Sequence, residues 1–429
     1  MDHGALMRGI KDREALVGII GLGYVGLPLA MAAGEAGFEV LGLEKDGEKR
    51  DRLARGDALY EGLDGDRLKA LVARGRLRVS GDPADLASCG VMCVCVPTPL
   101  SRTRDPDLSF VREAAAMARG ALGGGKPKLA VVESTSYPGT TREVVLSILR
   151  EGGMELGRDF FLAYSPERVD PGNARWTISN TPKLVGGMSA ACAELAEAFY
   201  RCFVDEVVRV SSPEVAEMAK ILENIFRGVN IALVNELWML CERMGLDVWE
   251  VIGAAATKPF GFMPFWPGPG LGGHCIPVDP FYLAWKAREY DFQTEFIELA
   301  GKVNVNMPYF VAGKVAEKLN EAGKTVRGSR VLVLGVAYKP DVGDTRETPA
   351  AKLMELLRSR GAEVAYHDPH VPAFDLDGEV LRSAELDEET LSGCDCVVIV
   401  TAHSGVDYRL VAGSGVPVLD TRNALRAMA

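Results

Sequence analysis

The chain has 429 residues, 48% hydrophobic and 25% charged, which is typical of a globular protein with two or three domains. Its net charge of −11, without a Lys/Arg block, disfavours nucleic acid as a partner. No run of ~18 apolar residues occurs, and the N-terminal segment lacks a signal peptide's apolar stretch, so no membrane partner and a cytoplasmic location are expected. Nine cysteines are scattered over the chain, and eight of them are expected to be buried, reduced thiols. Neither C-x-C pair, Cys93/Cys95 or Cys394/Cys396, has a matching second pair or a histidine cluster, so no metal site is expected.

The first part of the chain alternates strand and helix patterns. Residues 15–43 comprise an apolar run, a glycine turn, a helical stretch ended by Gly37 and a second apolar run. Further strands are predicted at 91–97, 128–135 and 159–165. This alternation predicts a doubly wound, parallel α/β sheet of the Rossmann type over residues 1–210.

A long helical region and a second α/β pattern follow. Residues 211–214 (Ser-Ser-Pro-Glu) form a helix start, and about thirty residues follow without proline. A second helical stretch is predicted from about 281 to 322, which makes 211–322 a helical connector. Strand patterns resume afterwards, with a helix capped by Thr348 and begun by Pro349, and predict a second Rossmann-like domain over 323–429.

The glycine turn near residue 20 indicates a dinucleotide site. Gly21, Gly23 and Gly26 lie between a strand and a helix, where backbone amides can approach a pyrophosphate. Glu44 ends the second strand, where an acid can bind the ribose 2′-hydroxyl and repel a 2′-phosphate, so NAD is favoured over NADP. The alternatives are a purely structural tight turn, or an adenosine-cofactor site such as that of a methyltransferase.

A cysteine stands in the glycine-rich run GPGLGGHCIPVDP at 268–280. Gly272 and its neighbours offer little side chain to bury Cys275, and His274 and Asp279 are polar. A thiolate in such a setting is a candidate nucleophile. A packed thiol is the alternative, as most cysteines are.

Polar side chains also recur on the long helix and at strand ends. Lys220 and Asn224 are four residues apart and share one helix face, which could stabilise an oxyanion or merely be solvated. Thr135 and Glu167 follow predicted strands, where such sheets place ligands, although each is also a common turn residue.

The last candidate group follows the first strand of the second α/β pattern. Lys339 and Arg346 suit a phosphate-bearing ligand. With Asp344 between them, a surface salt-bridge cluster is the alternative.

Seven motifs together resemble the UDP-glucose/GDP-mannose dehydrogenase family, in the family's order and along nearly the whole chain. They are GLGYVGLPLA, VPTPL at 96–100, EST at 133–135, SPERVDPGN at 165–173, EMAKILENIFRGVNIALVNE at 217–236, GPGLGGHCIPVDP, and GVAYKPDVGDTRETPA at 335–350. The resemblance implies NAD-dependent, four-electron oxidation of a nucleotide-sugar C6 alcohol to a carboxylate. It also implies an N-terminal NAD domain, a central dimerising region, a C-terminal nucleotide-sugar domain, and a homodimer or higher homo-oligomer.

The resemblance assigns roles to matching residues. It implies that Cys275 is the nucleophile, that Lys220 and Asn224 stabilise the oxyanion, and that Asp279, Thr135 and Glu167 assist water and proton transfer. The implied cofactor contacts are Gly21, Gly23, Tyr24, Val25, Gly26, Glu44, Thr98, Thr135 and Arg346. The implied substrate contacts are Glu167, Arg168, Lys220, Asn224, Gly272, His274 and Lys339.

Two positions refine the resemblance. The UDP-glucose branch has a second acid four residues after the one matched by Glu167, but here that position is Pro171, and Asp170 precedes it. His274 stands where the UDP-glucose and GDP-mannose branches have Ser, and it is most similar to the branch acting on UDP-N-acetylhexosamines. UDP-N-acetylglucosamine is the expected substrate, with UDP-N-acetylmannosamine second and UDP-glucose also open. The competing functions are a two-electron NAD-dependent alcohol dehydrogenase and a non-catalytic nucleotide-binding regulator.

Overall fold

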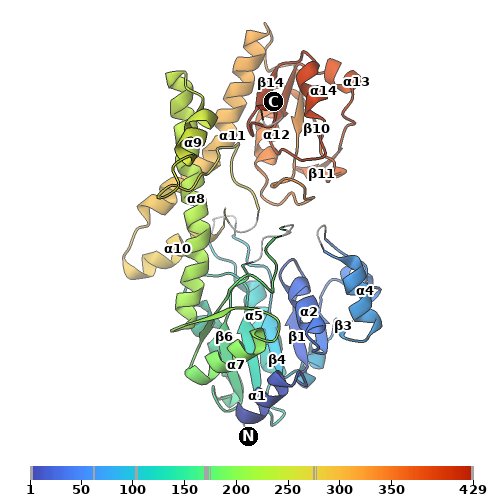
Figure 1. The fold of residues 1–429 in the computed structure, drawn as a ribbon, viewed down its shortest axis with the longest axis vertical. Coiled ribbons are helices and arrows are strands. Elements are labelled where there is room, and N and C mark those ends of the chain that lie inside the picture. Colours follow the sequence, from blue (N-terminus) through green and yellow to red (C-terminus); the bar gives the residue numbers. More distant parts are fainter. Residues whose placement is uncertain are drawn as a thin grey trace. The chain divides into compact units, whose positions relative to one another are not determined.

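The computed structural model describes residues 3–60, 63–101, 105–168, 173, 175–273, 276 and 278–426. The chain divides into two compact units (Figure 1). The first is Met1–Glu223 with Phe281–Asp291, and the second is Asn224–Pro280 with Phe292–Ala429. Within the described residues, no helix has the length and apolar character needed to cross a membrane.

The first unit is built on an eight-stranded sheet with the order β3-β2-β1-β4-β5-β6-β7-β8. Strands β1 to β6 run parallel, β7 is antiparallel to β6, and β8 is parallel to β7. The predicted strands are confirmed, but the predicted wholly parallel sheet gains a reversed pair. The bounds are β1 Val17–Ile20, β2 Val40–Leu43, β3 Leu77–Ser80, β4 Val91–Val94, β5 Lys128–Val132, β6 Phe160–Tyr164, β7 Lys183–Gly187 and β8 Val207–Val210.

The central strands β1, β2, β4, β5 and β6 are buried along their whole length, as expected where helices cover both faces of a parallel sheet. β1 lies between β2 and β4, so the strand order reverses at β1, and sheets of this type bind ligands at the carboxyl ends of the strands beside such a reversal. The helices are α1 His3–Lys11, α2 Gly26–Glu35, α3 Gly47–Ala54, α4 Gly65–Ala73, α5 Ser109–Gly120, α6 Leu146–Leu149 and α7 Ala190–Tyr200, with short turns η1 Pro83–Ser88, η2 Thr141–Val145 and η3 Glu151–Gly153.

The second unit contains a four-stranded parallel sheet with the order β10-β9-β13-β14, which confirms a second Rossmann-like domain. Its strands are β9 Arg330–Leu334, β10 Glu363–His367, β13 Cys396–Ile399 and β14 Val418–Asp420, beside a hairpin of β11 Ala373–Leu376 and β12 Glu379–Arg382. Helices α9 Val248–Ala256 and α11 Glu295–Glu321 contribute buried residues to the same core as β9 and α12 Pro349–Ser359. Two short helices, α13 Glu388–Ser392 and α14 Tyr408–Gly413, complete it.

The predicted long helix is α8, Pro213–Met244. The second predicted stretch, 281–322, is not one helix: α10 (Asp279–Ala287) and η4 (Arg288–Tyr290) end before α11 begins. The break falls at Asp291, whose φ of 53° is left-handed and cannot continue a right-handed helix. The domain boundaries at 210 and 322 stay predictions.

Candidate functional site

In the glycine turn after β1, two glycines leave no room for a side chain, and the third has open space beside it. Gly21 has φ 94°, and a Cβ there would lie 2.6 Å from the Cys95 carbonyl oxygen. A Cβ on Gly26 would lie 1.9 Å from the Gly21 oxygen, so this turn closes only without side chains. A Cβ on Gly23 would meet nothing within 4 Å. Gly23 thus presents bare backbone just before Val25, the N-cap of α2, as a pyrophosphate site requires.

Glu44 lies beside this turn at the end of β2. Its carboxylate accepts hydrogen bonds from the backbone N–H of Leu22 at 3.4 Å and of Asp46 at 3.0 Å. Tyr24 packs on Tyr60, with ring centroids 4.0 Å apart, and the Tyr60 hydroxyl donates to the Leu22 carbonyl at 3.3 Å. The acid and the turn are therefore held together, as ribose and pyrophosphate binding would need.

Two further predicted residues follow the neighbouring strands. The buried Ser134 hydroxyl accepts from Val96 N at 2.9 Å and donates to Val96 O at 2.8 Å, which ties the end of β5 to the segment after β4. Half-buried Thr98 and Thr135 flank this tie at the carboxyl edge of the sheet. Together with the turn and Glu44, these residues fit a bound NAD.

Glu167 belongs to a buried charge cluster. Its Oε2 lies 3.4 Å from Nζ of Lys183, the first residue of β7, and that Nζ lies 2.6 Å from Oε2 of Glu133. The Tyr200 hydroxyl donates to the other Glu133 oxygen at 2.5 Å. Burial raises the pKa of Glu133, and the Lys183 charge opposes that rise.

Arg168 fixes the backbone next to Glu167. Its N–H donates to Glu167 Oε1 at 2.7 Å. Its guanidinium donates to the Pro182 carbonyl at 2.7 Å and pairs with Glu223 of α8 at 2.9 Å. Arg168 thus links the segment after β6 to the long helix.

The start of α8 is tied to the segment that follows Thr135. Buried Glu217 accepts hydrogen bonds from Gly139 N at 2.6 Å and from the N–H and hydroxyl of Thr141 at 2.8 and 2.6 Å. Burial raises the pKa of Glu217 to about 7. One turn on, Lys220 is half-buried and has no ion-pair partner among the described residues.

In the second unit the structure brings together two predicted catalytic residues. Asn224 Nδ2 donates to Asp279 Oδ2 at 2.5 Å, although 55 residues separate them. Both are buried, with 9% and 3% exposure, and Asp279 is the first residue of α10. An amide and a carboxylate are therefore fixed side by side.

The glycines that precede the cysteine pack against the segment after β9. A Cβ on Gly272 would lie 2.6 Å from the Tyr338 Cβ, and one on Gly273 would lie 3.0 Å from the Tyr338 ring. Gly273 also donates its N–H to the Arg346 carbonyl at 2.9 Å. Cys275, His274, Asp170 and Pro171 lie outside the described residues.

The segment after β9 carries two cationic residues, Arg346 and Lys339. Arg346 forms a fork with the Asp344 carboxylate at 2.6 to 3.1 Å, so this pair makes a salt bridge, and the phosphate-binding role of Arg346 stays a prediction. Lys339 lies in the same segment, next to the turn around Asp341, whose φ is 60°.

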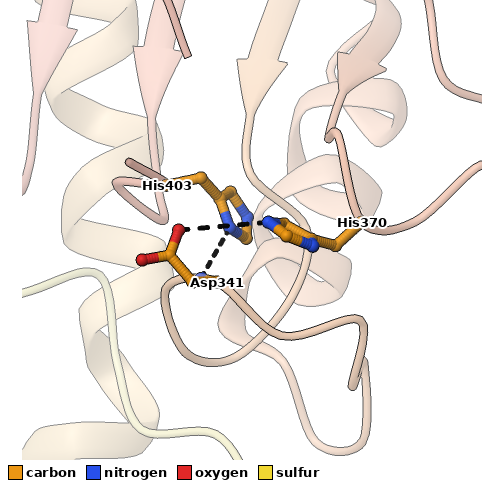
Figure 2. A group of neighbouring side chains, drawn as sticks. All are labelled: Asp341, His370 and His403. Atoms are coloured by element: carbon orange, nitrogen blue, oxygen red, sulfur yellow. Dashed lines mark hydrogen bonds and ion pairs between the residues drawn. The ribbon is translucent and has the colours of Figure 1, made fainter. Parts of the chain in front are cut away.

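Asp341, His370 and His403 cluster at this turn and have the composition of a metal site (Figure 2). However, His403 Nδ1 accepts the Asp341 N–H at 2.9 Å, and its Nε2 lies 3.0 Å from Asp368 Oδ2. The first contact requires an unprotonated Nδ1, so the neutral ring donates from Nε2 to Asp368. Both His403 nitrogens are thus already used.

The Asp341 carboxylate is engaged as well. Its Oδ1 accepts from the Ser404 N–H at 2.8 Å and the Ser404 hydroxyl at 2.9 Å, and lies 3.9 Å from His370 Nε2. A metal ion would have to displace these bonds. The cluster is better described as a hydrogen-bonded clasp that holds the turn carrying Lys339.

Comparison with known proteins identifies the family. Models of the UDP-glucose/GDP-mannose dehydrogenase family match in series: the NAD binding domain at 15–204, the central domain at 214–306 and the UDP binding domain at 332–427. The chain belongs to the UDP-glucose/GDP-mannose dehydrogenase family. It is thus an NAD-dependent oxidoreductase of that family, and the glycine turn and Glu44 fall in the NAD binding domain.

Relatives within the family are similar over most of their length. A UDP-N-acetyl-D-mannosamine dehydrogenase of Pyrococcus horikoshii is 37% identical over 393 residues, covering 90% of this chain and 89% of that protein. A UDP-N-acetyl-D-glucosamine 6-dehydrogenase of Pseudomonas aeruginosa is 34% identical over 395 residues, covering 91% of each. The solved structure of a UDP-D-ManNAc dehydrogenase from Pyrococcus horikoshii matches with a TM-score of 0.86 and 32% identity, over 96% of this chain and 100% of that chain.

The predicted site residues divide between the two units. The first carries Gly21, Gly23, Tyr24, Val25, Gly26, Glu44, Thr98, Thr135, Glu167, Arg168 and Lys220, and the second carries Asn224, Gly272, Asp279, Lys339 and Arg346. The sequence interpretation missed Glu133, Lys183 and Glu217. The charges of Glu133 and Lys183 at the ends of otherwise apolar strands were the available signal.

Proposed function

We propose that this family member is a UDP-N-acetylhexosamine 6-dehydrogenase that oxidises the C6 alcohol to a carboxylate in two two-electron steps. The observation that supports the proposal is the buried Asn224–Asp279 pair, in which the amide proposed to stabilise the oxyanion is hydrogen-bonded to an acid four residues after Cys275. A solvated helix face, the competing interpretation of Asn224, does not fit 9% exposure.

NAD would be held by Gly21, Gly23, Gly26, Glu44, Thr98 and Thr135, and one NAD would accept the hydride in each of the two oxidations. The C6 hydroxyl loses its proton to a water ordered by Asp279, while Lys220 and Asn224 stabilise the developing alkoxide. Loss of a hydride from C6 would give the aldehyde, and the Cys275 thiolate would add to its carbon to form a thiohemiacetal. Loss of a second hydride from C6 would convert the thiohemiacetal to a thioester. Water, with Glu167 accepting a proton, then releases the acid and the thiol.

The N-acetylhexosamine class follows from His274 and its flanking sequence, and its epimer is the finer question. We propose UDP-N-acetylglucosamine as substrate, with UDP-N-acetylmannosamine second. Relatives of both names have similar identity to this chain, at 34% and 37%. The choice therefore depends on measurement with both sugars.

The deciding experiment counts NADH released per sugar consumed, with UDP-N-acetylglucosamine, UDP-N-acetylmannosamine and UDP-glucose in parallel. Two NADH per sugar are expected, fastest with the true substrate. One NADH per sugar would make the protein a two-electron alcohol dehydrogenase. Tight nucleotide-sugar binding with no NADH would instead indicate a regulator.

A cysteine pair provides the matched control. Cys275→Ala should abolish formation of the acid, because no thioester can form. Cys394→Ala should keep the wild-type rate, since Cys394 is a half-buried thiol whose pKa is raised by burial. Full four-electron turnover by Cys275→Ala would refute the covalent mechanism.

We also propose that a second copy of the chain covers one face of α8, which would make the protein a homodimer. Phe226, Leu233 and Leu240 recur every seven residues and are 48%, 56% and 50% exposed, and Met244 is 61% exposed. Such a stripe is typical of a helix that pairs with another. Light scattering after size exclusion should report a dimer, and Leu233→Glu should shift it toward monomer; a monomeric wild type would refute this proposal.

A further inference from the structure

The buried lysine at the start of β7 serves two carboxylates at once. Lys183 has a side-chain exposure of 6%, against 0% for Glu133 and 13% for Glu167. A single cation therefore neutralises one acid that is sealed in the core and also reaches a second acid near the surface. Structural burial of Glu133 alone would not require the contact with Glu167.

The hydrogen bonds indicate the charge states in the cluster. Both oxygens of Glu133 accept hydrogen bonds, one from Lys183 and one from Tyr200, so this carboxylate is ionised. Burial lowers the pKa of Lys183, but the charges of Glu133 and Glu167 outweigh burial and the net direction is upward. Lys183 is thus a permanent cation beside Glu167.

We propose that Lys183 is a positioning residue that keeps the Glu167 carboxylate ionised and correctly oriented to accept a proton. The inference rests on the proposed role of Glu167. An opposite charge at 3.4 Å favours the ionised form of a carboxyl group. Glu133 limits the effect, because it shares the same cation and repels Glu167.

Other groups that face Glu167 come from neighbouring elements. Arg168 contributes its backbone N–H to Oε1, while its guanidinium is directed to Pro182 and Glu223. Burial raises the pKa of Cys95, which follows β4, well above its usual value, so that thiol is neutral. Among the described residues, Lys183 and Glu133 thus carry two opposite charges near Glu167 that separate substitutions can remove.

Two variants should move the ionisation of Glu167 in opposite directions. Glu133→Gln keeps an oxygen for the Tyr200 hydroxyl but removes the competing charge, so Glu167 should titrate lower. The double variant Glu133→Gln/Lys183→Met removes the cation without leaving a buried unpaired acid, so Glu167 should titrate higher by about one pH unit. Lys183→Arg keeps a cation at this position, so the titration midpoint of Glu167 should stay at the wild-type value.

The ionisation of Glu167 is measured by infrared spectroscopy of substrate-free protein as a function of pH. The carboxylate band of Glu167 is the one that disappears in Glu167→Gln. This readout does not depend on turnover, so it separates failure of the inference from failure of the proposed function, which NADH counting tests. In active protein, the acid limb of the kcat profile should shift in the same direction as the infrared midpoint. An upward shift of one pH unit means a tenfold lower kcat on that limb, and a downward shift means a higher kcat there.

Lys128 provides the matched control. It is also a buried lysine at the start of a strand, but its Nζ donates to the carbonyls of Leu86, Ala87 and Cys89. Lys128→Met should lower stability and leave the Glu167 midpoint unchanged. Unchanged midpoints in both Glu133 variants, or the same shift in Lys128→Met, would overturn the inference.

Discussion

Replacing Gly23 by alanine should separate cofactor binding from folding. A Cβ at Gly23 meets nothing within 4 Å, and this residue is not among those with positive φ. The fold should therefore accept alanine, with a change in unfolding free energy of at most about 0.5 kcal/mol. At Gly26, by contrast, the methyl group would lie 1.9 Å from the Gly21 oxygen, and the turn cannot close.

The cost should appear when NAD binds. A methyl group at Gly23 occupies space that the pyrophosphate needs, so one or two charge-assisted hydrogen bonds from the turn would be lost or lengthened. Each such bond contributes about 1.5–3 kcal/mol, so the net loss of one bond predicts roughly 10- to 100-fold weaker binding. KM for NAD should rise while kcat at saturation changes little.

Calorimetric titration with NADH and urea denaturation without cofactor test this directly. Gly253→Ala is the control, because Gly253 lies inside α9, also has open space, and is outside the proposed site. It should raise stability by about 0.5–1 kcal/mol and leave the NADH Kd unchanged. Wild-type affinity in Gly23→Ala, or its unfolding, would refute this account of the turn.

Three further outcomes follow from single side chains. The pKa of Glu217 in the folded state is raised from 4.5 to about 7, so the folded state binds more protons than the unfolded state between these pH values. The free energy of unfolding should therefore fall by on the order of 3 kcal/mol as pH rises through that window. The urea midpoint should be lower at pH 8 than at pH 5, and Glu217→Gln should reduce this difference. His403→Ala should cost about 1–3 kcal/mol in urea denaturation because Asp368 loses a buried partner, and should weaken UDP binding through the Lys339 turn, as calorimetry would detect. Glu44→Gln should narrow the preference for NAD over NADP, and an unchanged kcat/KM ratio would exclude its ribose contact.

The sequence predicted most of the fold because its strongest signals are local. The apolar run before Gly21 forms β1, and the proline-free stretch after Pro213 forms α8. Each of these patterns is contained in one continuous segment of the chain. The reversal of β7 and β8 has no such signal. These short sequences acquire their direction only from pairing, as where Ala163 of β6 faces Gly187 of β7. Tertiary contacts, not propensity, determine such strands.

Contacts between distant parts of the chain were likewise not predicted for the candidate site. Sequence placed Lys220 and Asn224 on one helix face, but it could not pair Asn224 with Asp279 or join Lys183 to Glu133 across 50 residues. A charged residue at a strand end has many possible partners, and only the fold selects one. The roles of these residues in catalysis remain predictions.

The two Rossmann-like turns explain why similar halves bind different ligands. Gly335 after β9 repeats the geometry of Gly21: its φ is 81°, and a Cβ would lie 2.3 Å from the Thr401 carbonyl oxygen. Two residues after Gly21 the first turn has Gly23, whereas two residues after Gly335 the second turn has Ala337. Backbone access of the kind that Gly23 provides is therefore lost.

The acids that follow the second strand of each unit, Glu44 after β2 and Asp368 after β10, also differ in their access to a ligand. Glu44 is half-buried beside an open glycine, whereas Asp368 is 2% exposed and accepts the N–H groups of Val336 and Ala337 at 2.8 and 3.0 Å. The amides that could bind a pyrophosphate are thus already satisfied by the chain, and His403 occupies the same carboxylate. A nucleotide bound by this unit would therefore have to rely on residues beyond the turn, and the contact of Lys339 with it stays a prediction.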